Sequence, residues 1–306
     1  MNKQADIPDF IKALPRAYFT EEDSAEVVTG QNVNAKDERL KEIMGAVTRH
    51  LHAAIKEIEP TQEEWMKAIL YLTATGHKSD DWRQEFILLS DVLGVSMLVD
   101  AINSRRPKGA SENTVLGPFH IGGTPEFEMG FNICLDGKGE DMVARGRVLD
   151  VDGNPLEGVK IDVWQANDEG FYDVQQKGIQ PDFNLRGVFR TGKDGTYWFK
   201  AVRPQHYSIP DDGPVGDLLY ALGRHPYRPA HLHYIISKEG YDEVTTHIFD
   251  PDDIYINNDA VFGVKESLIA DFVKIEDPAK IAEMGFDGPF YWDVEFDFVL
   301  APKEDK

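Results

Sequence analysis

Cysteine is almost absent from this sequence, whose 306 residues include only Cys134. A single cysteine excludes an internal disulfide framework and fits the reducing environment of the cytoplasm, which we therefore expect as the location. The apolar neighbours of this cysteine, Phe131, Ile133 and Leu135, indicate a buried strand position rather than a nucleophile.

Long apolar runs are also missing. The longest, from Phe86 to Val99, is interrupted by Ser90 and Asp91 and is too short to cross a bilayer. Residues 1–13 are mixed and charged and contain no apolar signal segment. We therefore expect neither a membrane span nor a cleaved leader.

Positive charge is scarce, since 32 Lys and Arg residues face 54 Asp and Glu residues and the net charge is −22. Nucleic acids and anionic membrane surfaces would repel such a chain, so neither is expected as a partner. No G-x-G-x-x-G fingerprint occurs, so the sequence shows no sign of a dinucleotide cofactor.

The first third of the chain has the apolar period of helices. Apolar residues between 37 and 59 recur at spacings of three, four and seven, which predicts an amphipathic helix that ends at Pro60. Thr61 to Glu64 has the pattern of a capping box and predicts a second helix, which ends at Gly76. A third helix is predicted from Asp81 to Asn103.

These helices form a predicted N-terminal domain, residues 1–109. Helices without strands cannot bury all of their apolar surface in one thin layer, so we expect this domain to pair with a second copy in a homodimer. His50, His52 and His77 lie in polar stretches without a matching ligand nearby and are assigned no chemistry.

After Gly109 the apolar period changes to two. Apolar and polar residues alternate from Val159 to Trp164 and strictly from Phe290 to Leu300, with turn signals between such runs. This pattern predicts a mainly β fold, in which an antiparallel β-sandwich catalytic domain, residues 110–306, follows the helical dimerisation domain. Within it, residues 261–273 alone look like a short helix.

Two histidines lie in the strand-like segment from Arg228 to Ile236. Side chains alternate along a strand, so His231 and His233 point to the same face with their Cβ atoms about 7 Å apart. They could bind one metal ion or form a hydrogen-bonded pair in the core, and the H-x-H pattern alone does not separate these two interpretations.

Further segments strengthen the metal interpretation, and two of them lie in connections too long for simple hairpins, which are usually functional. The segments are WQANDEGFY (164–172), RPQHYSIP (203–210), LGRHPYRPAHLH (222–233) and TVLGPF (114–119). Together they closely resemble the intradiol ring-cleaving catechol dioxygenases, and the resemblance covers nearly the whole chain. Three other stretches resemble the branch of that family that cleaves hydroxyquinol, benzene-1,2,4-triol: LSDVLGVS (89–96), THIF (246–249) and DAVFGVK (259–265).

The resemblance implies one non-haem Fe(III) ion per chain, held by Tyr172, Tyr207, His231 and His233. Fe(III) is a hard cation that phenolate oxygen suits better than thiolate does. A free tyrosine has a pKa of about 10, but a trivalent ion at bonding distance would keep it deprotonated at neutral pH. Two phenolates and one hydroxide balance three positive charges, so such a centre can be buried.

The resemblance also assigns catalytic roles. Tyr207 is the ligand that a catecholic substrate displaces, and it takes up a substrate proton, while the other three ligands stay in place. Arg228 stabilises the negative charge that builds on the substrate ring. His247 stands where many relatives have glutamine, and it either donates a hydrogen bond towards the reacting centre or fills the space behind the ligands.

A further set of side chains surrounds the substrate ring by the same resemblance: Leu88, Asp91, Val115, Leu116, Gly117, Phe119, Ile209, Pro210, Arg228 and Val261. Asp91 stands out, because a carboxylate on an otherwise apolar helix is costly to bury without a partner. That partner is either the third hydroxyl of hydroxyquinol, which would favour this substrate over catechol, or an arginine of the chain itself.

The leading hypothesis is therefore an Fe(III) intradiol dioxygenase that cleaves hydroxyquinol with O2 to 3-hydroxy-cis,cis-muconate and maleylacetate in aromatic degradation. Catechol or chlorocatechol is the alternative substrate. A zinc hydrolase is disfavoured because zinc sites rarely use two tyrosines. A non-catalytic β-sandwich module is the third hypothesis, and a colourless protein would support it. The resemblance also implies that paired helical domains enclose a lipid-like molecule.

Overall fold

The structure is a computed structural model and describes residues 17–81 and 83–303. The chain divides into two compact units, Met1–Thr73 and Ala74–Lys306, and each is described by itself. This division falls earlier in the chain than the domain boundary that we predict close to Gly109 from the change of apolar period.

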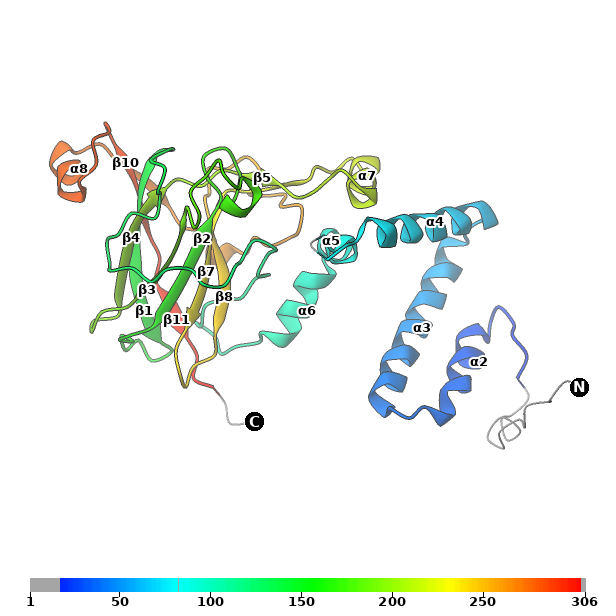
Figure 1. Cartoon of the computed structure of the whole chain (residues 1–306). Coiled ribbons are helices and arrows are strands. Elements are labelled where there is room, and N and C mark those ends of the chain that lie inside the picture. The colour runs from blue at the N-terminus through cyan, green and yellow to red at the C-terminus, as the bar shows by residue number, and fades with distance from the viewer. Residues whose placement is uncertain (1–16, 82, 304–306) are drawn as a thin grey trace, which may run out of the picture. The chain divides into compact units, whose positions relative to one another are not determined.

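The first unit is helical (Figure 1). Asp37 begins its longest helix by accepting a hydrogen bond from the Leu40 amide at 3.0 Å, and Glu59 ends that helix in a left-handed conformation. Thr61 and Glu64 form both hydrogen bonds of the predicted capping box. The elements are α2 (Ser24–Gly30), the 3-10 helix η1 (Gln31–Asn34), α3 (Glu38–Ile58) and most of α4 (Gln62–Lys78), which continues past the predicted end at Gly76.

The single helix predicted from Asp81 to Asn103 is wrong. The chain forms two helices there, α5 (Glu85–Val92) and α6 (Val95–Asn103). Gly94 separates them with a φ of 72°, a left-handed conformation that glycine adopts without steric cost. None of the helices in the described ranges combines the length and apolar character that crossing a membrane requires.

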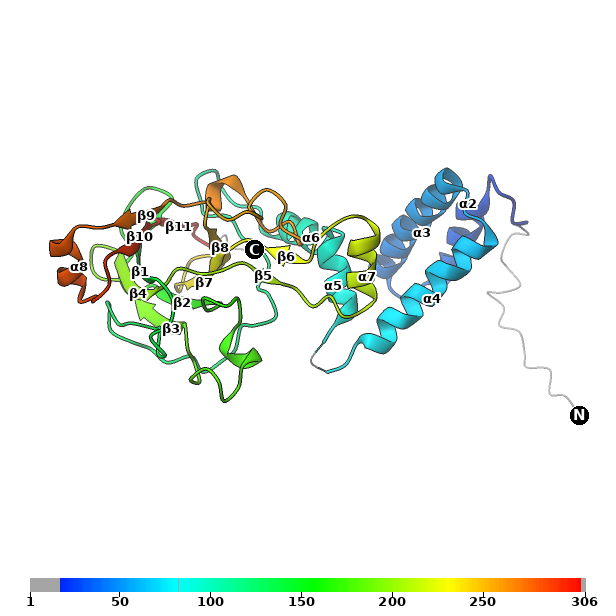
Figure 2. The same ribbon diagram turned by 90° about the horizontal axis from the view of Figure 1, so that it is seen from above.

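The second unit is built on two sheets that pack face to face (Figure 2). The four-stranded sheet is antiparallel and has the order β3 (Arg186–Arg190), β2 (Lys160–Gln165), β7 (His231–Ser237) and β8 (Val244–Phe249). The five-stranded sheet has the order β11 (Phe298–Leu300), β1 (Asp141–Asp150), β10 (Tyr291–Glu295) and β9 (Phe272–Ile275), with β4 (Thr196–Val202) also paired to β1.

The predicted helical region followed by a β-sandwich is confirmed, with three refinements. The five-stranded sheet is mixed, because β1 runs parallel to both β10 and β11. The strand predicted from Phe290 to Leu300 is divided into β10 and β11, which keep one register along β1. Helices also occupy much of the chain, so "mainly β" describes the second unit better than the whole protein.

The alternation of side chains along β7 determines where the histidines lie. Leu232, Tyr234 and Ile236 are at most 2% exposed and pack into the core between the two sheets. His231 and His233 occupy the intervening positions, so they lie on the other face of this sheet, as the sequence predicts. The core therefore fixes the strand, and the strand presents both imidazoles outside the core.

Shorter elements lie in the connections: η2 (Asp173–Gln175), β5 (Tyr207–Ser208), α7 (Pro214–Ala221), β6 (Tyr227–Arg228), η3 (Glu266–Leu268) and α8 (Pro278–Met284). Helix α7, which the sequence pattern did not predict, packs against α5. The helix predicted at 261–273 is wrong, since only η3 forms there and β9 follows. Phe262 has a φ of 60°, which a right-handed helix does not allow.

Cys134 is buried, as predicted, although it lies outside the strands. Its Sγ donates a hydrogen bond to Asp136 Oδ1 at 3.4 Å. Burial, with the help of the neighbouring carboxylate, raises the pKa of the thiol to about 11. A thiol that stays protonated at neutral pH is a poor nucleophile, which agrees with a structural role.

Candidate metal centre

The four side chains predicted as metal ligands lie together beside the four-stranded sheet, and all four are buried. Tyr172 Oη lies 2.9 Å from His233 Nε2, and the Nε2 atoms of His231 and His233 are 3.1 Å apart. The ring of Tyr207 is 5.4 Å from that of Tyr172 and 5.5 Å from that of His231, measured between centroids. Two nitrogens and two phenol groups thus converge on one small volume.

The four ligands come from three segments. His231 and His233 belong to β7, whereas Tyr172 directly precedes η2, where its amide donates to the Gln175 side chain at 2.9 Å. Tyr207 lies in β5 and pairs with Arg228 in β6. A short two-stranded ribbon therefore carries one phenol and the nearby guanidinium to the sheet that bears the imidazoles.

The two imidazoles are neutral and offer a lone pair each. His231 Nδ1 lies 2.7 Å from the Pro229 carbonyl oxygen, to which it donates, so its Nε2 is unprotonated. Burial, with the Arg228 charge as a smaller contribution, lowers the pKa of His231 to about 3. Burial also lowers the pKa of His233 well below its ordinary value. A neutral imidazole is the form that binds a metal.

His233 is held by packing, since its Nδ1 has no hydrogen-bond partner within the described residues. The Trp164 ring stacks on it at 4.6 Å and 11°, and the His247 ring meets it edge-on at 4.2 Å. Arg186, Trp164, His233 and His247 are paired in register across β3, β2, β7 and β8. One row of buried side chains therefore sets the orientation of this ligand.

The same row of buried side chains is also connected to Tyr172, through Arg186. Arg186 Nε donates to Asp173 Oδ1 at 2.7 Å, and both side chains are buried. Asp173 directly follows Tyr172, and its other carboxylate oxygen accepts from the Phe183 amide at 3.0 Å. The buried ion pair thus ties the loop of one phenol ligand to the sheet of the imidazole ligands.

His247 lies directly behind the imidazoles. Its Nδ1 is 2.8 Å from Thr114 Oγ1, and its Nε2 is buried with no partner in the part of the chain that the structure describes. One ring nitrogen of His247 lies within 4.8 Å of ring nitrogens of both His231 and His233. The Thr114 contact uses one nitrogen of His247, so only Nε2 is available to the reacting centre.

The donor set determines what this space can hold. Burial raises the pKa of Tyr172 well above its ordinary value, and the neighbouring Tyr207 adds to the effect. The phenol therefore ionises only beside a strong positive charge. A hard trivalent cation supplies that charge and accepts both phenolate and imidazole ligands, so the residues present fit Fe(III).

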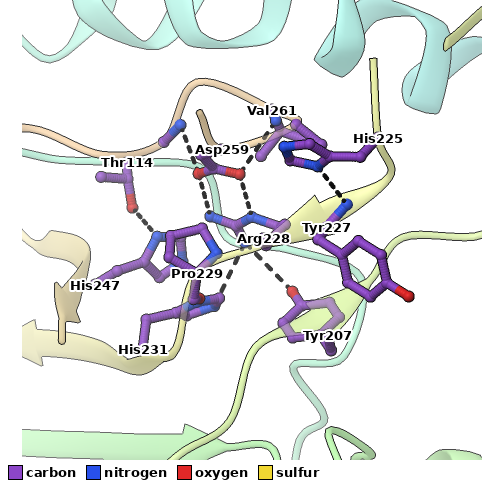
Figure 3. Close-up of polar contacts among 12 residues, drawn as sticks. Thr114, Tyr207, His225, Tyr227, Arg228, Pro229, His231, His247, Asp259 and Val261 are labelled. Atoms are coloured by element: carbon purple, nitrogen blue, oxygen red, sulfur yellow. Dashed lines mark hydrogen bonds and ion pairs between the residues drawn. The ribbon is translucent and has the colours of Figure 1, made fainter. Parts of the chain in front are cut away.

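Arg228 is a buried cation next to this centre (Figure 3). Its Nη1 lies 3.3 Å from Tyr207 Oη and 3.4 Å from His231 Nε2. Its Nε and Nη2 donate to the two carboxylate oxygens of Asp259 at 3.1 and 3.2 Å. Burial opposes the charged form, but Asp259 and Tyr207 outweigh it, so the pKa of Arg228 is raised.

The residues predicted to surround the substrate ring are partly brought together. Leu88, Ile209 and Val261 join one apolar cluster with Val92, Val215, Leu219 and Ala260. Phe119 stacks on Tyr172 at 4.5 Å and meets the edge of Tyr207 at 6.2 Å. Val115 and Leu116 directly precede Gly117 on the loop that approaches His233, and Leu116 is 43% exposed.

A cavity of about 380 Å³ lies beside Tyr207, with Ile209, Pro210, Phe171 and His206 also in its wall. A space of this size admits a single aromatic ring with its hydroxyl groups. Tyr207 is the one predicted ligand that borders this cavity, and Tyr172, His231 and His233 are not among the residues of its wall.

Asp91 lies on α5 and is partly buried, as expected of a side chain near the pocket. Burial raises the pKa of its carboxyl, while a hydrogen bond from Ser96 and the charge of Arg228 act in the opposite direction. No arginine forms an ion pair with it among residues 17–81 and 83–303. A direct ion pair between Asp91 and an arginine, the alternative interpretation, is therefore not seen in these ranges, although the charge of Arg228 favours the ionised carboxylate.

Glycine is required at position 117 for two reasons: its backbone is left-handed, and it lies close to the His233 ring. Its φ is +77°, and a Cβ atom there would lie 3.1 Å from Cε1 of His233. We expect Gly117→Ala to lower the free energy of unfolding by about 1–2 kcal/mol, the usual cost of a left-handed alanine. Displacement of His233 should also lower iron retention at least tenfold, as loss of a supporting contact does (roughly 10–100-fold).

Gly123→Ala is the matched control. Gly123 has a φ of +81°, and a Cβ atom there would meet nothing within 4 Å. Gly123→Ala has the same cost of a left-handed alanine but no contact with His233. Thermal unfolding should therefore show a similar loss of stability in both variants, whereas metal analysis should show loss of iron only in Gly117→Ala. Equal iron content in the two variants would show that the contact with His233 is unimportant.

Sequence reasoning missed three contributors. Asp173 directly follows Tyr172 and Trp164 begins the segment that ends at Tyr172, but only the tertiary structure shows that Trp164 stacks on a ligand and that Asp173 anchors the loop. Asp259 lies in a segment singled out for its resemblance, yet its partner Arg228 is 31 residues away. No local pattern connects two residues at that separation.

Comparison with known proteins agrees with this geometry. Residues 123–302 match the family model described as "Dioxygenase", and residues 37–111 match one described as "Catechol dioxygenase N terminus". The chain is 68% identical to a hydroxyquinol 1,2-dioxygenase of Rhizobium sp. (strain MTP-10005), with 93% of this chain and 96% of that protein covered.

Solved structures agree as well. Hydroxyquinol 1,2-dioxygenase from Pseudomonas putida DLL-E4 superposes with a TM-score of 0.87 at 44% identity, covering 92% of this chain and 99% of that one. Catechol 1,2-dioxygenase of Acinetobacter radioresistens has a TM-score of 0.80 at 29% identity, covering 95% and 96%. The family matches, the high identity and the converging donors lead to one conclusion: this chain belongs to the intradiol ring-cleavage dioxygenases.

Proposed function

We propose that this protein cleaves hydroxyquinol with O2 between its two adjacent hydroxyl-bearing carbons, giving 3-hydroxy-cis,cis-muconate, which tautomerises to maleylacetate. Both atoms of O2 enter the product, so no reductant is consumed. The observation that carries this proposal is the convergence of Tyr172, Tyr207, His231 and His233 on one buried volume. The 68% identity to a protein named hydroxyquinol 1,2-dioxygenase supports the choice of substrate.

The family uses non-haem Fe(III), and we propose that one ion per chain is held by these four side chains. Bound there, Fe(III) would supply a Lewis acid that holds the substrate as a diolate and makes its ring susceptible to O2. The imidazoles are neutral before any ligand arrives, so no proton has to leave them. The surrounding apolar and aromatic side chains keep bulk water from the centre.

Tyr207 is the side chain best placed to exchange a proton with the substrate. It lies at the wall of the cavity, and its Oη accepts a hydrogen bond from Arg228 Nη1 at 3.3 Å. A cation at that distance stabilises an oxygen that bears negative charge, whether it belongs to Tyr207 or to the bound diolate. We therefore assign Tyr207 as proton acceptor and Arg228 as the electrostatic partner.

The remaining pocket residues position the ring. Leu88, Ile209 and Val261 supply an apolar wall, and Phe119 stacks against Tyr172. Asp91 is the acceptor that we propose for the third hydroxyl of hydroxyquinol, because burial disfavours its charge and no ion pair compensates it in the described part of the chain. His247 supports the pocket by binding Thr114, at the start of the loop that carries Gly117.

Comparison of three substrates tests the proposal. Purified protein should contain iron and be coloured by tyrosinate bound to Fe(III). Its kcat/KM should be higher for hydroxyquinol than for catechol or 4-chlorocatechol, measured as oxygen uptake under one set of conditions. Faster turnover of catechol would contradict the substrate assignment. A colourless protein that contains zinc would contradict the reaction itself.

We also propose residues 1–109 as the dimerisation region and residues 110–306 as the catalytic region. The single cysteine supports the cytoplasm as the location.

Helix α3 leaves one apolar face exposed: Leu40, Ile43, Met44, Val47, Leu51 and Ile55. An uncovered face of this kind is typical of a surface that pairs with a second copy, with room for a lipid-like molecule. Sedimentation velocity measures the mass: Leu51→Glu should favour the monomer, and Arg49→Glu, at an exposed residue outside this face, should not.

A further inference from the structure

One carboxylate, that of Asp259, neutralises the buried guanidinium next to the metal centre. It is 5% exposed, and Arg228 is 2% exposed. The two side chains meet as a fork, through Nε to Oδ1 at 3.1 Å and through Nη2 to Oδ2 at 3.2 Å. Two parallel hydrogen bonds fix the plane of a guanidinium as well as its position. They leave Nη1 as the nitrogen that faces Tyr207 and His231.

The same carboxylate shapes the loop that follows it. Oδ1 also accepts from the Val261 amide at 3.2 Å, and Oδ2 accepts from the Gly263 amide at 2.9 Å (Figure 3). A Cβ atom on Gly263 would lie 2.7 Å from Arg228 Nη2, so the loop backbone is pressed against the guanidinium. The loop and the cation therefore share one set of hydrogen bonds and cannot move independently.

The loop in turn carries part of the proposed ring-binding wall. Val261 is 4% exposed and packs in one cluster with Ile209 and Val92. Its amide is held by the carboxylate that holds Arg228, so the distance between the apolar wall and the cation is set by a single side chain. A substrate ring that lies between them would be positioned from both sides.

From this geometry we infer that Asp259 is a positioning residue: it directs Arg228 Nη1 to the reacting centre and holds Val261 against the substrate ring. The inference rests on the proposed function. It predicts that loss of the carboxylate changes turnover and substrate choice together, although Asp259 itself touches neither the ligands nor the substrate. A purely structural ion pair would change only the stability of the fold.

Asp259→Asn is the first test, because the amide places N–H donors opposite the donors of Arg228 and the loop. We expect kcat for hydroxyquinol to fall about 100-fold, as misplacement of a catalytic group by about 1 Å does. Activity on 4-chlorocatechol relative to hydroxyquinol should rise about tenfold, because displacement of Val261 makes room for one larger substituent. Iron content should stay near that of the parent, while the visible absorption maximum shifts because Arg228 contacts Tyr207.

Asp250→Asn is the matched control. Asp250 is 2% exposed, accepts from Arg203 Nε at 2.6 Å and from the Asp252 amide at 2.9 Å, and thus also combines a buried ion pair with a loop contact. It should lose thermal stability without a change in the substrate ratio or the visible spectrum. If Asp259→Asn behaves like this control, Asp259 is only structural and the inference is wrong.

Gly263→Ala provides a second route that leaves every charge in place. Its added methyl group would push the loop away from Arg228, so the substrate ratio should shift in the same direction as in Asp259→Asn. An unchanged ratio in a folded, iron-loaded Gly263→Ala protein would overturn the coupling. Failure of the proposed function would show differently, since the unmodified protein would then lack iron or ring-cleaving activity.

Discussion

Tyr172→Phe is expected to abolish ring cleavage and to remove most of the visible colour, because it deletes one of the two proposed phenolate ligands. The change removes a single oxygen and keeps the ring that stacks on Phe119 at 4.5 Å. Loss of a residue that merely supports a metal ligand costs roughly 10–100-fold in metal affinity or activity. Loss of a ligand itself should therefore exceed about 100-fold in kcat/KM for hydroxyquinol.

The fold should survive this substitution. Tyr172 Oη contacts His233 Nε2 at 2.9 Å, and the energy of one such hydrogen bond is about 1 kcal/mol. Burial disfavours the ionised phenol in the metal-free protein, so removal of the oxygen relieves no charge there. Metal-free Tyr172→Phe should unfold within a few degrees of the metal-free parent protein.

Tyr197→Phe is the control for loss of a buried phenol. Tyr197 is 1% exposed and donates from its Oη to the Phe296 carbonyl oxygen at 2.8 Å, within the sandwich core. This variant should lose about 1 kcal/mol of stability and keep iron, colour and activity. If Tyr172→Phe retained the colour and activity of Tyr197→Phe, Tyr172 would not be a ligand.

Asp91→Leu is expected to lower the ratio of kcat/KM for hydroxyquinol to that for catechol by about 100-fold. A site that hydrogen-bonds a substrate hydroxyl rejects the analogue without it, because the polar group of the site is then left unpaired. Leucine reverses this preference, since the pocket then has nothing to pair with a third hydroxyl. Oxygen uptake with both substrates measures the ratio.

The same variant should be more stable than the parent protein at neutral pH. Burial raises the pKa of the Asp91 carboxyl in the folded state, so over the interval between its unfolded and folded pKa values the folded state binds more protons. Stability therefore falls as the pH rises through that interval, and the cost persists above it. In thermal unfolding, the melting temperature of Asp91→Leu should exceed that of the parent protein by more at pH 7 than at about pH 4.

Glu85→Leu provides the contrast within the same helix. Glu85 is fully buried, accepts from Arg83 Nε at 2.8 Å and from the Val215 amide at 3.2 Å, and so joins α5 to α7. Arg83 keeps a second partner in Asp212, so the variant should fold with a loss of about 3 kcal/mol. The substrate ratio should not change. An equal change of ratio in both variants would mean that Asp91 acts through α5 and not through the substrate.

The helices show where local patterns suffice. The 3.6-residue period correctly predicts α3, because an apolar stripe is a property of one contiguous segment. The same reasoning failed at Gly94, where one left-handed residue divides a continuous apolar run into α5 and α6. It failed again after Asp259, whose side chain holds the following amides in a loop.

The site shows the same division. The H-x-H pattern in β7 and the resemblance of the loops name residues that the structure then gathers around one point. The resemblance already names His247, but the other supports of His233 were not predictable. Arg186 and Trp164 reach His233 only through the pairing of β3, β2 and β7, and such pairing depends on register across the sheet.

By itself, then, the amino-acid order determined the donor types, the face of β7 on which two imidazoles lie, and the family, because these depend on side-chain chemistry, on the two-residue period of a strand and on likeness along the whole chain. Only the tertiary structure decided which groups neutralise and orient the donors. Arg228 with Asp259, and Asp173 with Arg186, are buried pairs whose members come from different loops and strands. A buried charge must find a partner in space, and sequence distance does not specify that partner.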